Sequence, residues 1–176
     1  MNGGVKGTEN LVNAAVNAGV RRFVHLSSIA VYGIRPNGVS FTEATPFYEN
    51  GKTWNNYARQ KVLSERLVWQ AHTDGRIQVT TFRPSLVIGA GDRNTVGQTL
   101  RFIRSPVGGI IGDGYNHMAC VVVDEVVRTI VNGMSSEIAI GKAYNLSGRK
   151  RITQIEYMNY YAKAAGLKCL SRRIPT

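Results

Sequence analysis

The chain has 176 residues, of which 43% are apolar, so it is long enough for one domain with a hydrophobic core and short for two. It contains no run of about 18 apolar residues and no apolar segment near its start, which argues against a membrane span and a secretory signal. The net charge of +11 would attract anions, but the basic residues are spread along the chain without a nucleic-acid-binding motif, so we expect no specific nucleic-acid partner.

The two cysteines, Cys120 and Cys169, lack the spacing of metal ligands and could form one disulfide at most. We interpret both as small packing residues of a reduced protein. A cytoplasmic location and the absence of a metal site are the corresponding expectations.

The first predicted element is a helix over residues 8–18, ended by Gly19. Its apolar side chains follow the 3.6-residue period of a helix. They are Leu11, Val12, Ala14, Ala15 and Ala18. A short buried strand is predicted over residues 22–26, between Gly19 and the pair Ser27-Ser28.

Residues 33–53 are predicted to form a loop, because Pro36, Gly38, Pro46 and Gly51 lie within them. At about twenty residues this loop is longer than most connections, and such loops often carry function. Three aromatic side chains are expected to hold it by packing, namely Phe41, Phe47 and Tyr48.

A second helix is predicted over residues 54–71. One side of this helix carries Tyr57, Lys61, Ser64 and Val68. Three apolar residues are expected near the core, namely Val62, Leu63 and Leu67. Glu65 follows Lys61 by four residues, and we interpret it as the partner in a surface ion pair worth a few tenths of a kcal/mol.

The second half of the chain continues the alternation of strands and helices. A strand over residues 77–82 is followed by a helix over 95–104 and by a β-branched segment that reaches Val123. Asp124 is predicted to N-cap the next helix, which contains Val126, Val127 and Ile130. A strand over 143–146 follows. Thr153 and Glu156 form a predicted capping box for a helix that reaches Ala165 and ends at Gly166. This alternation predicts one α/β domain with a parallel sheet.

Tyr57 and Lys61 form the first candidate catalytic pair. Four residues apart on a helix, their side chains leave the same face one turn apart. A free tyrosine is a poor acid or base at neutral pH, but an ammonium group within about 4–6 Å favours the phenolate. Ser28 adds a hydroxyl after a strand, where open α/β sheets bind their ligands, and could hydrogen-bond the substrate oxygen that Tyr57 protonates.

A Tyr-x-x-x-Lys spacing alone is common and usually marks an amphipathic tyrosine beside a solvated lysine. Here it follows the string Ser-Ser-x-Ala-Val-Tyr-Gly, which begins at Ser27. Two further strings are Val-Lys-Gly-Thr-Glu-Asn-Leu from Val5 and Arg-Pro-Ser-Leu-Val-Ile-Gly-Ala-Gly-Asp from Arg83. With these motifs the chain resembles the extended short-chain dehydrogenase/reductase family, which comprises NAD-dependent epimerases, dehydratases and hydroxysteroid-dehydrogenase-like enzymes.

This resemblance implies that Ser28, Tyr57 and Lys61 are a catalytic triad acting on a secondary alcohol or ketone of a small-molecule substrate. It implies NAD or NADP as the cofactor. The residues that it places at the cofactor are Ser27, Tyr57, Lys61, Pro84, Ser85 and Val87. It also implies a Rossmann-type doubly wound parallel sheet, part of a small C-terminal substrate lobe, and a homodimer in the full-length form.

One motif of the family is missing: the sequence contains no Gly-x-x-Gly-x-x-Gly, which would cradle a pyrophosphate. We therefore expect a fragment that lacks the first strands of the Rossmann sheet and is inactive alone. The strand at 22–26 would then lack one neighbour and form an exposed edge. The alternative is a non-catalytic nucleotide-binding or regulatory module.

The substrate is left open between a sugar nucleotide and a hydroxysteroid-like molecule. Sugar-nucleotide enzymes of this family usually carry an arginine at the position of Met118, beside His117. Its absence favours an uncharged substrate mildly. We interpret His117 as structural.

Overall fold

The computed structural model describes residues 2–33, 40–48 and 56–175. Contacts divide the chain into two compact units. The first unit contains the residues up to Ser85 together with Asp124–Leu146, and the second contains Leu86–Val123 together with the residues from Ser147 onward.

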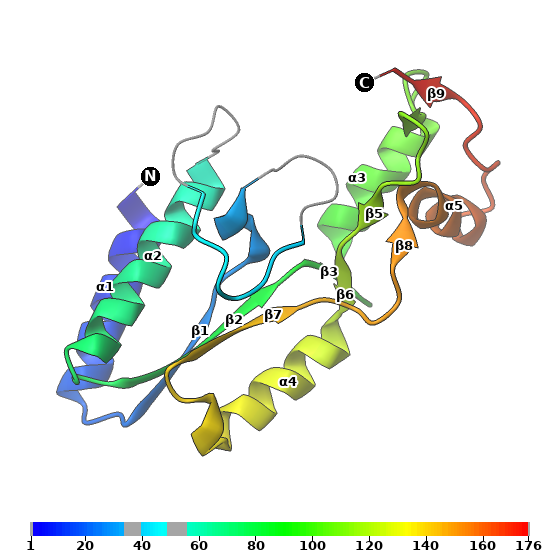
Figure 1. Cartoon of the computed structure of the whole chain (residues 1–176). Coiled ribbons are helices and arrows are strands. Elements are labelled where there is room, and N and C mark those ends of the chain that lie inside the picture. Colours follow the sequence, from blue (N-terminus) through cyan, green and yellow to red (C-terminus); the bar gives the residue numbers. More distant parts are fainter. Residues whose placement is uncertain (1, 34–39, 49–55, 176) are drawn as a thin grey trace. The chain divides into compact units, whose positions relative to one another are not determined.

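The first unit is built on a three-stranded parallel sheet with the order β1-β2-β7. Its strands are β1 (Arg22–Leu26), β2 (Gln78–Pro84) and β7 (Lys142–Leu146). The helices α1 (Asn2–Asn17) and α2 (Asn56–Thr73) lie on one face of the sheet, and α4 (Val123–Ser135) lies on the other (Figure 1). Helices on both faces of a parallel sheet confirm the predicted α/β class.

The central strand β2 is buried on both faces, as its position requires. Val79 packs with Val12 and Val68 beneath α1 and α2. Phe82 faces α4, and a Cβ atom added at Gly133 would lie 2.4 Å from its ring. The absence of a side chain at Gly133 therefore lets α4 approach the sheet.

The helix α1 begins at Asn2, six residues before the predicted start. Gly3, Gly4 and Gly7, which disfavour a helix by propensity, all lie within it. At Gly4 a Cβ atom would overlap the side chain of Gln60 on α2, so the glycine allows close packing of the two helices. The predicted stop is confirmed: Gly19 has a φ of 69°, and the next amide donates to the carbonyl of Ala15 at 2.9 Å.

The strand β1 has the predicted bounds but is not the buried strand that we expected. Only His25 is buried, whereas Phe23 and Val24 are half-buried and Leu26 is 47% exposed. Within the described residues β1 pairs with β2 alone, so it forms an edge of the sheet.

The connection between β1 and α2 begins with a 3₁₀-helix, η1 (Ile29–Tyr32). Phe41 stacks on Tyr32 with ring centroids 5.0 Å apart, Phe47 packs on the same cluster, and the amide of Tyr48 donates to the carbonyl of Val31 at 2.9 Å. These contacts confirm that the three aromatic residues hold the segment 40–48. The predicted loop residues Pro36, Gly38 and Gly51, and the predicted helix start at residue 54, lie outside the described residues.

The helix α2 continues to Thr73, two residues beyond its predicted end. Val62 is buried and Leu67 packs on the core, as expected. Leu63 is 39% exposed, because it lies on the side of the helix away from the core, and its predicted burial is wrong.

The second unit contains three short strand pairs and two helices. β3 (Leu86–Ile88) pairs with β6 (Cys120–Val122), and β4 (Ile110–Ile111) pairs with β9 (Arg173–Ile174), both in parallel. β5 (His117–Met118) and β8 (Ile152–Thr153) are antiparallel. The helices α3 (Arg93–Arg104) and α5 (Gln154–Ala164) pack against each other.

The N-termini of α5 and α4 test the two capping predictions, and α3 has a cap that was not predicted. The capping box of Thr153 and Glu156 is confirmed at α5. Asp92 caps α3 by accepting from the amides of Asn94 and Thr95, and the helix starts two residues before the predicted position. Asp124 is not an N-cap, because α4 begins at Val123 directly after β6; its carboxylate lies in the first turn, where the helix dipole favours it.

Both cysteines are free. Cys120 is buried, as a packing residue should be, whereas Cys169 is exposed, so the packing interpretation is wrong for Cys169. None of the described helices combines the length and the hydrophobicity that a membrane crossing requires.

Candidate active site

Four of the predicted site residues, Ser27, Ser28, Pro84 and Ser85, lie where parallel strands of the first unit end. Ser27 and Ser28 follow β1, and its neighbour β2 ends at Pro84, which Ser85 follows. The amide of Ser27 donates to the carbonyl of Phe82 at 2.7 Å, and that of Ser85 donates to the carbonyl of Leu146 at 2.8 Å. These bonds hold both serines at the carboxyl edge of the sheet.

Ser28 occupies the N-cap of η1 in an extended conformation, with φ −163° and ψ 152°. Its Oγ accepts from the amide of Ala30 at 3.2 Å. A serine hydroxyl has one proton to donate and two lone pairs. Since no described group accepts the Ser28 proton, the cap leaves it available to a ligand oxygen.

Lys61 connects the helix to the strand end. Its Nζ donates to the carbonyl of Leu26 at 3.0 Å and lies 5.9 Å from the centre of the Tyr57 ring. The Tyr57 side chain is exposed, so solvent and ligands can reach it. The structure thus brings Tyr57 and Lys61 together, beside the backbone that leads into Ser27 and Ser28.

The other residues predicted to bind the cofactor differ in placement. The hydroxyls of Ser27 and Ser85 are buried and have no hydrogen-bond partner among the described residues. A buried hydroxyl without a partner is costly, so a polar ligand at this edge would stabilise both. Val87 lies in the middle of β3, in the second unit.

His25 lies beneath the site, on β1. Burial lowers its pKa from the ordinary 6.5 to about 4; the charge of Glu65 opposes this shift and that of Lys61 adds to it. Its side chain is therefore neutral at physiological pH, in agreement with a structural role.

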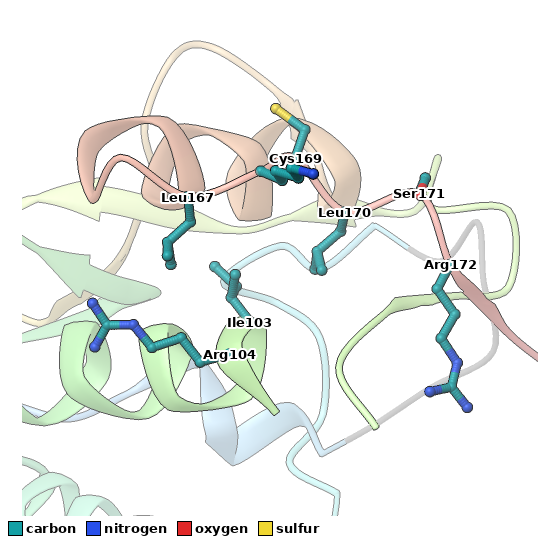
Figure 2. Close-up of a pocket in the computed structure, with 8 residues that line it drawn as sticks. Ile103, Arg104, Leu167, Cys169, Leu170, Ser171 and Arg172 are labelled. Carbon is teal, nitrogen blue, oxygen red and sulfur yellow. The ribbon is translucent and has the colours of Figure 1, made fainter. Parts of the chain in front are cut away.

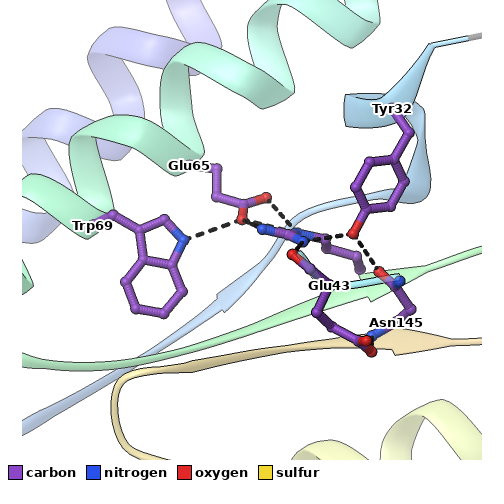
Figure 3. A network of polar contacts seen from close by, with 6 residues as sticks. Tyr32, Glu43, Glu65, Trp69 and Asn145 are labelled. Carbon is purple, nitrogen blue, oxygen red and sulfur yellow. Dashed lines mark hydrogen bonds and ion pairs between the residues drawn. The ribbon is translucent and has the colours of Figure 1, made fainter. Parts of the chain in front are cut away.

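A buried ion pair between Glu65 and Arg83 lies in the first unit, and the sequence analysis missed it (Figure 3). The carboxylate of Glu65 accepts from Nη2 of Arg83 at 2.5 Å and from its Nε at 2.9 Å, and also from Nε1 of Trp69. Glu65 is 0% exposed, so its predicted role in a surface pair with Lys61 is wrong. Burial alone would lower the pKa of Arg83, but the hydrogen bond and charge of Glu65 raise it above its ordinary value.

The same guanidinium also bonds to Tyr32 and Glu43, and both of these residues bond to Asn145. Its Nη1 donates to the hydroxyl of Tyr32 at 2.6 Å, and that hydroxyl donates to Oδ1 of Asn145 on β7 at 2.8 Å. Nη1 also donates to the carbonyl of Glu43 at 3.2 Å, and the Glu43 carboxylate accepts from the amide of Asn145. We call Arg83, Glu65, Tyr32, Asn145 and Glu43 the Arg83 network.

The sequence contains a signal for the position of Glu65. The buried residues of α2 include Ala58, Val62, Glu65, Val68 and Ala71, which lie three or four residues apart. Glu65 falls in this series, on the core face, where a carboxylate needs a buried cation. Its i+4 spacing to Lys61 favoured the surface interpretation instead.

The second unit contains a cavity of about 330 Å³ (Figure 2). Its lining includes the apolar Ile103, Leu167 and Leu170, together with three cationic residues. The cationic residues are Arg104, Lys168 and Arg172. None of the predicted site residues lines it, so it is separate from the serine, tyrosine and lysine cluster.

Comparison with known proteins identifies the family. Residues 1–147 match the NAD dependent epimerase/dehydratase family. The chain belongs to this family. The match confirms the resemblance to extended short-chain dehydrogenases/reductases that the motifs indicated.

Two curated relatives show the range of chemistry in the family. The chain is 30% identical over 183 residues to 3beta-hydroxysteroid-dehydrogenase/decarboxylase isoform 2 of Arabidopsis thaliana, covering 97% of this chain and 32% of the relative. It is 30% identical over 167 residues to dTDP-glucose 4,6-dehydratase of Streptomyces griseus, covering 92% and 48%. The chain thus spans about half or less of the length of these relatives.

Solved structures support the fold. DesIV, a dTDP-glucose 4,6-dehydratase from Streptomyces venezuelae crystallised with NAD, superposes with a TM-score of 0.77 at 25% identity, covering 97% of this chain and 52% of DesIV. UDP-glucuronic acid 4-epimerase from Bacillus cereus superposes with a TM-score of 0.78 at 21% identity, covering 98% and 56%. The partial Rossmann-type sheet predicted from the sequence is therefore confirmed.

Proposed function

We propose that the chain carries the catalytic site of an NAD-dependent oxidoreductase or epimerase that acts on a secondary alcohol or ketone. The observation that carries this proposal is the double contact of Lys61, to the Tyr57 ring and to the Leu26 carbonyl at the end of β1. One lysine thereby joins the proton-transfer tyrosine to the strand end that bears Ser28.

Each residue has a distinct role in the proposed mechanism. Tyr57 exchanges a proton with the reacting substrate oxygen, and Lys61, whose Nζ lies 5.9 Å from the centre of the Tyr57 ring, places a positive charge beside it. Ser28 donates its free proton to the same oxygen and fixes its position. These groups manage the proton and the orientation of the substrate.

NAD, when bound, supplies the acceptor and donor of the hydride that leaves or returns to the substrate carbon. The buried hydroxyls of Ser27 and Ser85 fit a polar ligand at the carboxyl edge of the sheet, which supports cofactor binding there. We assign Lys61 to the nicotinamide ribose, and Pro84, Ser85 and Val87 to the nicotinamide pocket. NAD is preferred to NADP because DesIV and the Bacillus cereus epimerase were crystallised with NAD.

The substrate class is proposed to be a sugar nucleotide or a hydroxysteroid-like molecule, since relatives of both kinds match the chain. Met118, at the position where sugar-nucleotide enzymes of the family usually carry an arginine, is half-buried in β5, and His117 beside it is exposed. The lack of a cationic side chain at position 118 supports the hydroxysteroid-like, uncharged substrate over the sugar nucleotide.

The test is NAD-dependent turnover of the full-length protein that contains this chain, with UDP-glucose, dTDP-glucose and a 3β-hydroxysteroid as probe substrates. Replacing Tyr57 by Phe is expected to lower kcat at least about 10²-fold, the usual contribution of a positioned acid–base group. Tyr160→Phe is the matched control. Tyr160 is also exposed, and its ring centre lies 5.8 Å from Nζ of Lys150.

Unchanged turnover in Tyr57→Phe would refute the catalytic role. Binding of NAD without turnover of any probe, in both the wild type and the variant, would favour the alternative of a non-catalytic nucleotide-binding or regulatory module. Cofactor affinity measured by calorimetry distinguishes this outcome from a failure of the protein to bind NAD.

We also propose a domain assignment, an oligomeric state with a location, and a dependence of activity on the full-length protein. The first unit is proposed to be the C-terminal part of an NAD-binding Rossmann domain, and the second the start of a substrate lobe. The full-length form is proposed to be a cytoplasmic homodimer, which sedimentation equilibrium tests for its oligomeric state. Inactivity of the chain alone is proposed because it spans only about half of its relatives.

A further inference from the structure

We infer that Arg83 is a positioning residue of the proposed active site. Its guanidinium holds the Ser28 turn and the Tyr57–Lys61 helix against one strand, so that both face the same substrate oxygen. The inference rests on the proposed function, and it adds to it a reason why side chains from two separate elements keep a fixed relative position.

The first arm of the network reaches the helix. Arg83 binds Glu65 through Nε and Nη2, and Glu65 follows Lys61 by four residues on α2. A planar guanidinium that makes two parallel bonds to a carboxylate fixes direction as well as distance. The bonds between Arg83 and Glu65 therefore fix the position of the α2 turn that follows Lys61 relative to β2.

The second arm reaches the serine turn. Arg83 Nη1 donates to the hydroxyl of Tyr32, which lies four residues after Ser28 at the end of η1. The hydroxyl in turn donates to Asn145 on β7, which sets the direction of its lone pairs toward Arg83. One guanidinium thus connects both elements of the site to two neighbouring strands (Figure 3).

Burial makes these bonds effective. The Arg83 side chain is 5% exposed and that of Glu65 is 0% exposed, so water does not compete for the paired atoms. The Phe47 ring packs against the guanidinium, with its centre 5.1 Å from the guanidinium carbon. By contrast, the bond from Lys61 to Leu26 is a single hydrogen bond from a flexible side chain at the strand end. The network supplies a second point of attachment for the helix.

The experiment compares amide hydrogen exchange in three variants of the full-length protein. Tyr32→Phe removes one hydroxyl and keeps the ring stacked on Phe41. The double variant Arg83→Met with Glu65→Leu removes both buried charges together, so neither is left unpaired. The control Thr80→Val removes a buried bond to the Ala139 carbonyl at a position three residues before Arg83 on the same strand.

The readout is the exchange of the Val31 and Gly33 amides, which are bonded to the carbonyls of Ser28 and Ala30. We expect about tenfold faster exchange at these amides in Tyr32→Phe and in the double variant, with α4 unchanged, and no local change in the control. A further variant, Arg83→Lys, should also exchange fast at these amides, because an ammonium group cannot make the two parallel bonds that the guanidinium makes to Glu65. Equal exchange at η1 in all variants, or a uniform increase that includes α4, would overturn the inference.

Turnover separates this inference from the proposed function. If the site is positioned by Arg83, kcat in the double variant falls about 10²-fold while KM for NAD changes little. If Tyr57→Phe loses activity and the double variant keeps it, the positioning role of Arg83 is refuted and the proposed mechanism is not. Full activity in Tyr57→Phe would refute the proposed mechanism, whereas the exchange measurement would still decide whether Arg83 orders the Ser28 turn.

Discussion

At the scale of single residues, the interior of the first unit contains ionisable side chains whose charge must be neutralised by a partner or avoided. Arg83 and Glu65 neutralise each other, whereas His25 is buried and its Nε2 has no hydrogen-bond partner in the described part of the chain. A buried base with no partner is favoured in its neutral form. His25 therefore makes the stability of the fold depend on pH.

The pKa of His25, lowered from 6.5 to about 4, predicts the direction of this dependence. Between these values the unfolded state binds more protons than the folded state, so stability falls as the pH falls from about 6.5 and the loss is complete below about 4. The full effect is about 3 kcal/mol. Urea unfolding at pH 7 and pH 5 should show a smaller decrease for His25→Gln than for the wild type. An equal decrease in both would contradict the assignment.

The buried ion pair predicts a second residue-scale result. Arg83→Met leaves the Glu65 carboxylate unpaired in the core and should cost about 3–5 kcal/mol of unfolding free energy. The double variant Arg83→Met with Glu65→Leu should recover most of this loss, because both charges are then absent. Urea unfolding of the two variants checks this. Equal stability of the single and double variants would show that the carboxylate is not confined in the core.

At the scale of elements, glycines decide how closely helices approach their neighbours. Gly133 on α4 faces the Phe82 ring, and Gly4 on α1 faces α2. Gly7 on α1 has no atom within 4 Å of the position of an added Cβ. Propensity favours alanine at all three positions, but packing opposes it at Gly133, against the buried Phe82 ring, and at Gly4, against the side chain of Gln60.

Gly133→Ala is therefore expected to destabilise the protein by about 1–3 kcal/mol, since α4 must move away from a fixed ring. The matched variant Gly7→Ala is expected to stabilise it by about 0.5–1 kcal/mol, because it only restricts the unfolded chain and favours the helix. Thermal unfolding of both variants measures the difference. A stabilising effect of Gly133→Ala would mean that α4 does not pack on Phe82 in solution.

At the scale of the whole molecule, the charge of +11 acts as a distributed field. The densest basic run, Arg149-Lys150-Arg151, contributes only three of the 22 lysine and arginine residues. We predict nonspecific binding to heparin that weakens steeply with salt. Replacing all three residues by serine should change the salt needed for elution only slightly. A complete loss of heparin binding would instead indicate a defined polyanion site.

The sequence by itself determined the alternation of elements, the bounds of β1, the capping box of α5 and the motifs that identify the family, because each depends on neighbours along the chain. It also placed Tyr57 and Lys61 on one helical face. Only the tertiary structure decided that Lys61 reaches Leu26 and that Glu65 is buried. These features depend on contacts between distant segments: the partner of Glu65 stands 18 residues away on another element. Local spacing favoured the nearer lysine, but the fold brought Arg83 to the carboxylate.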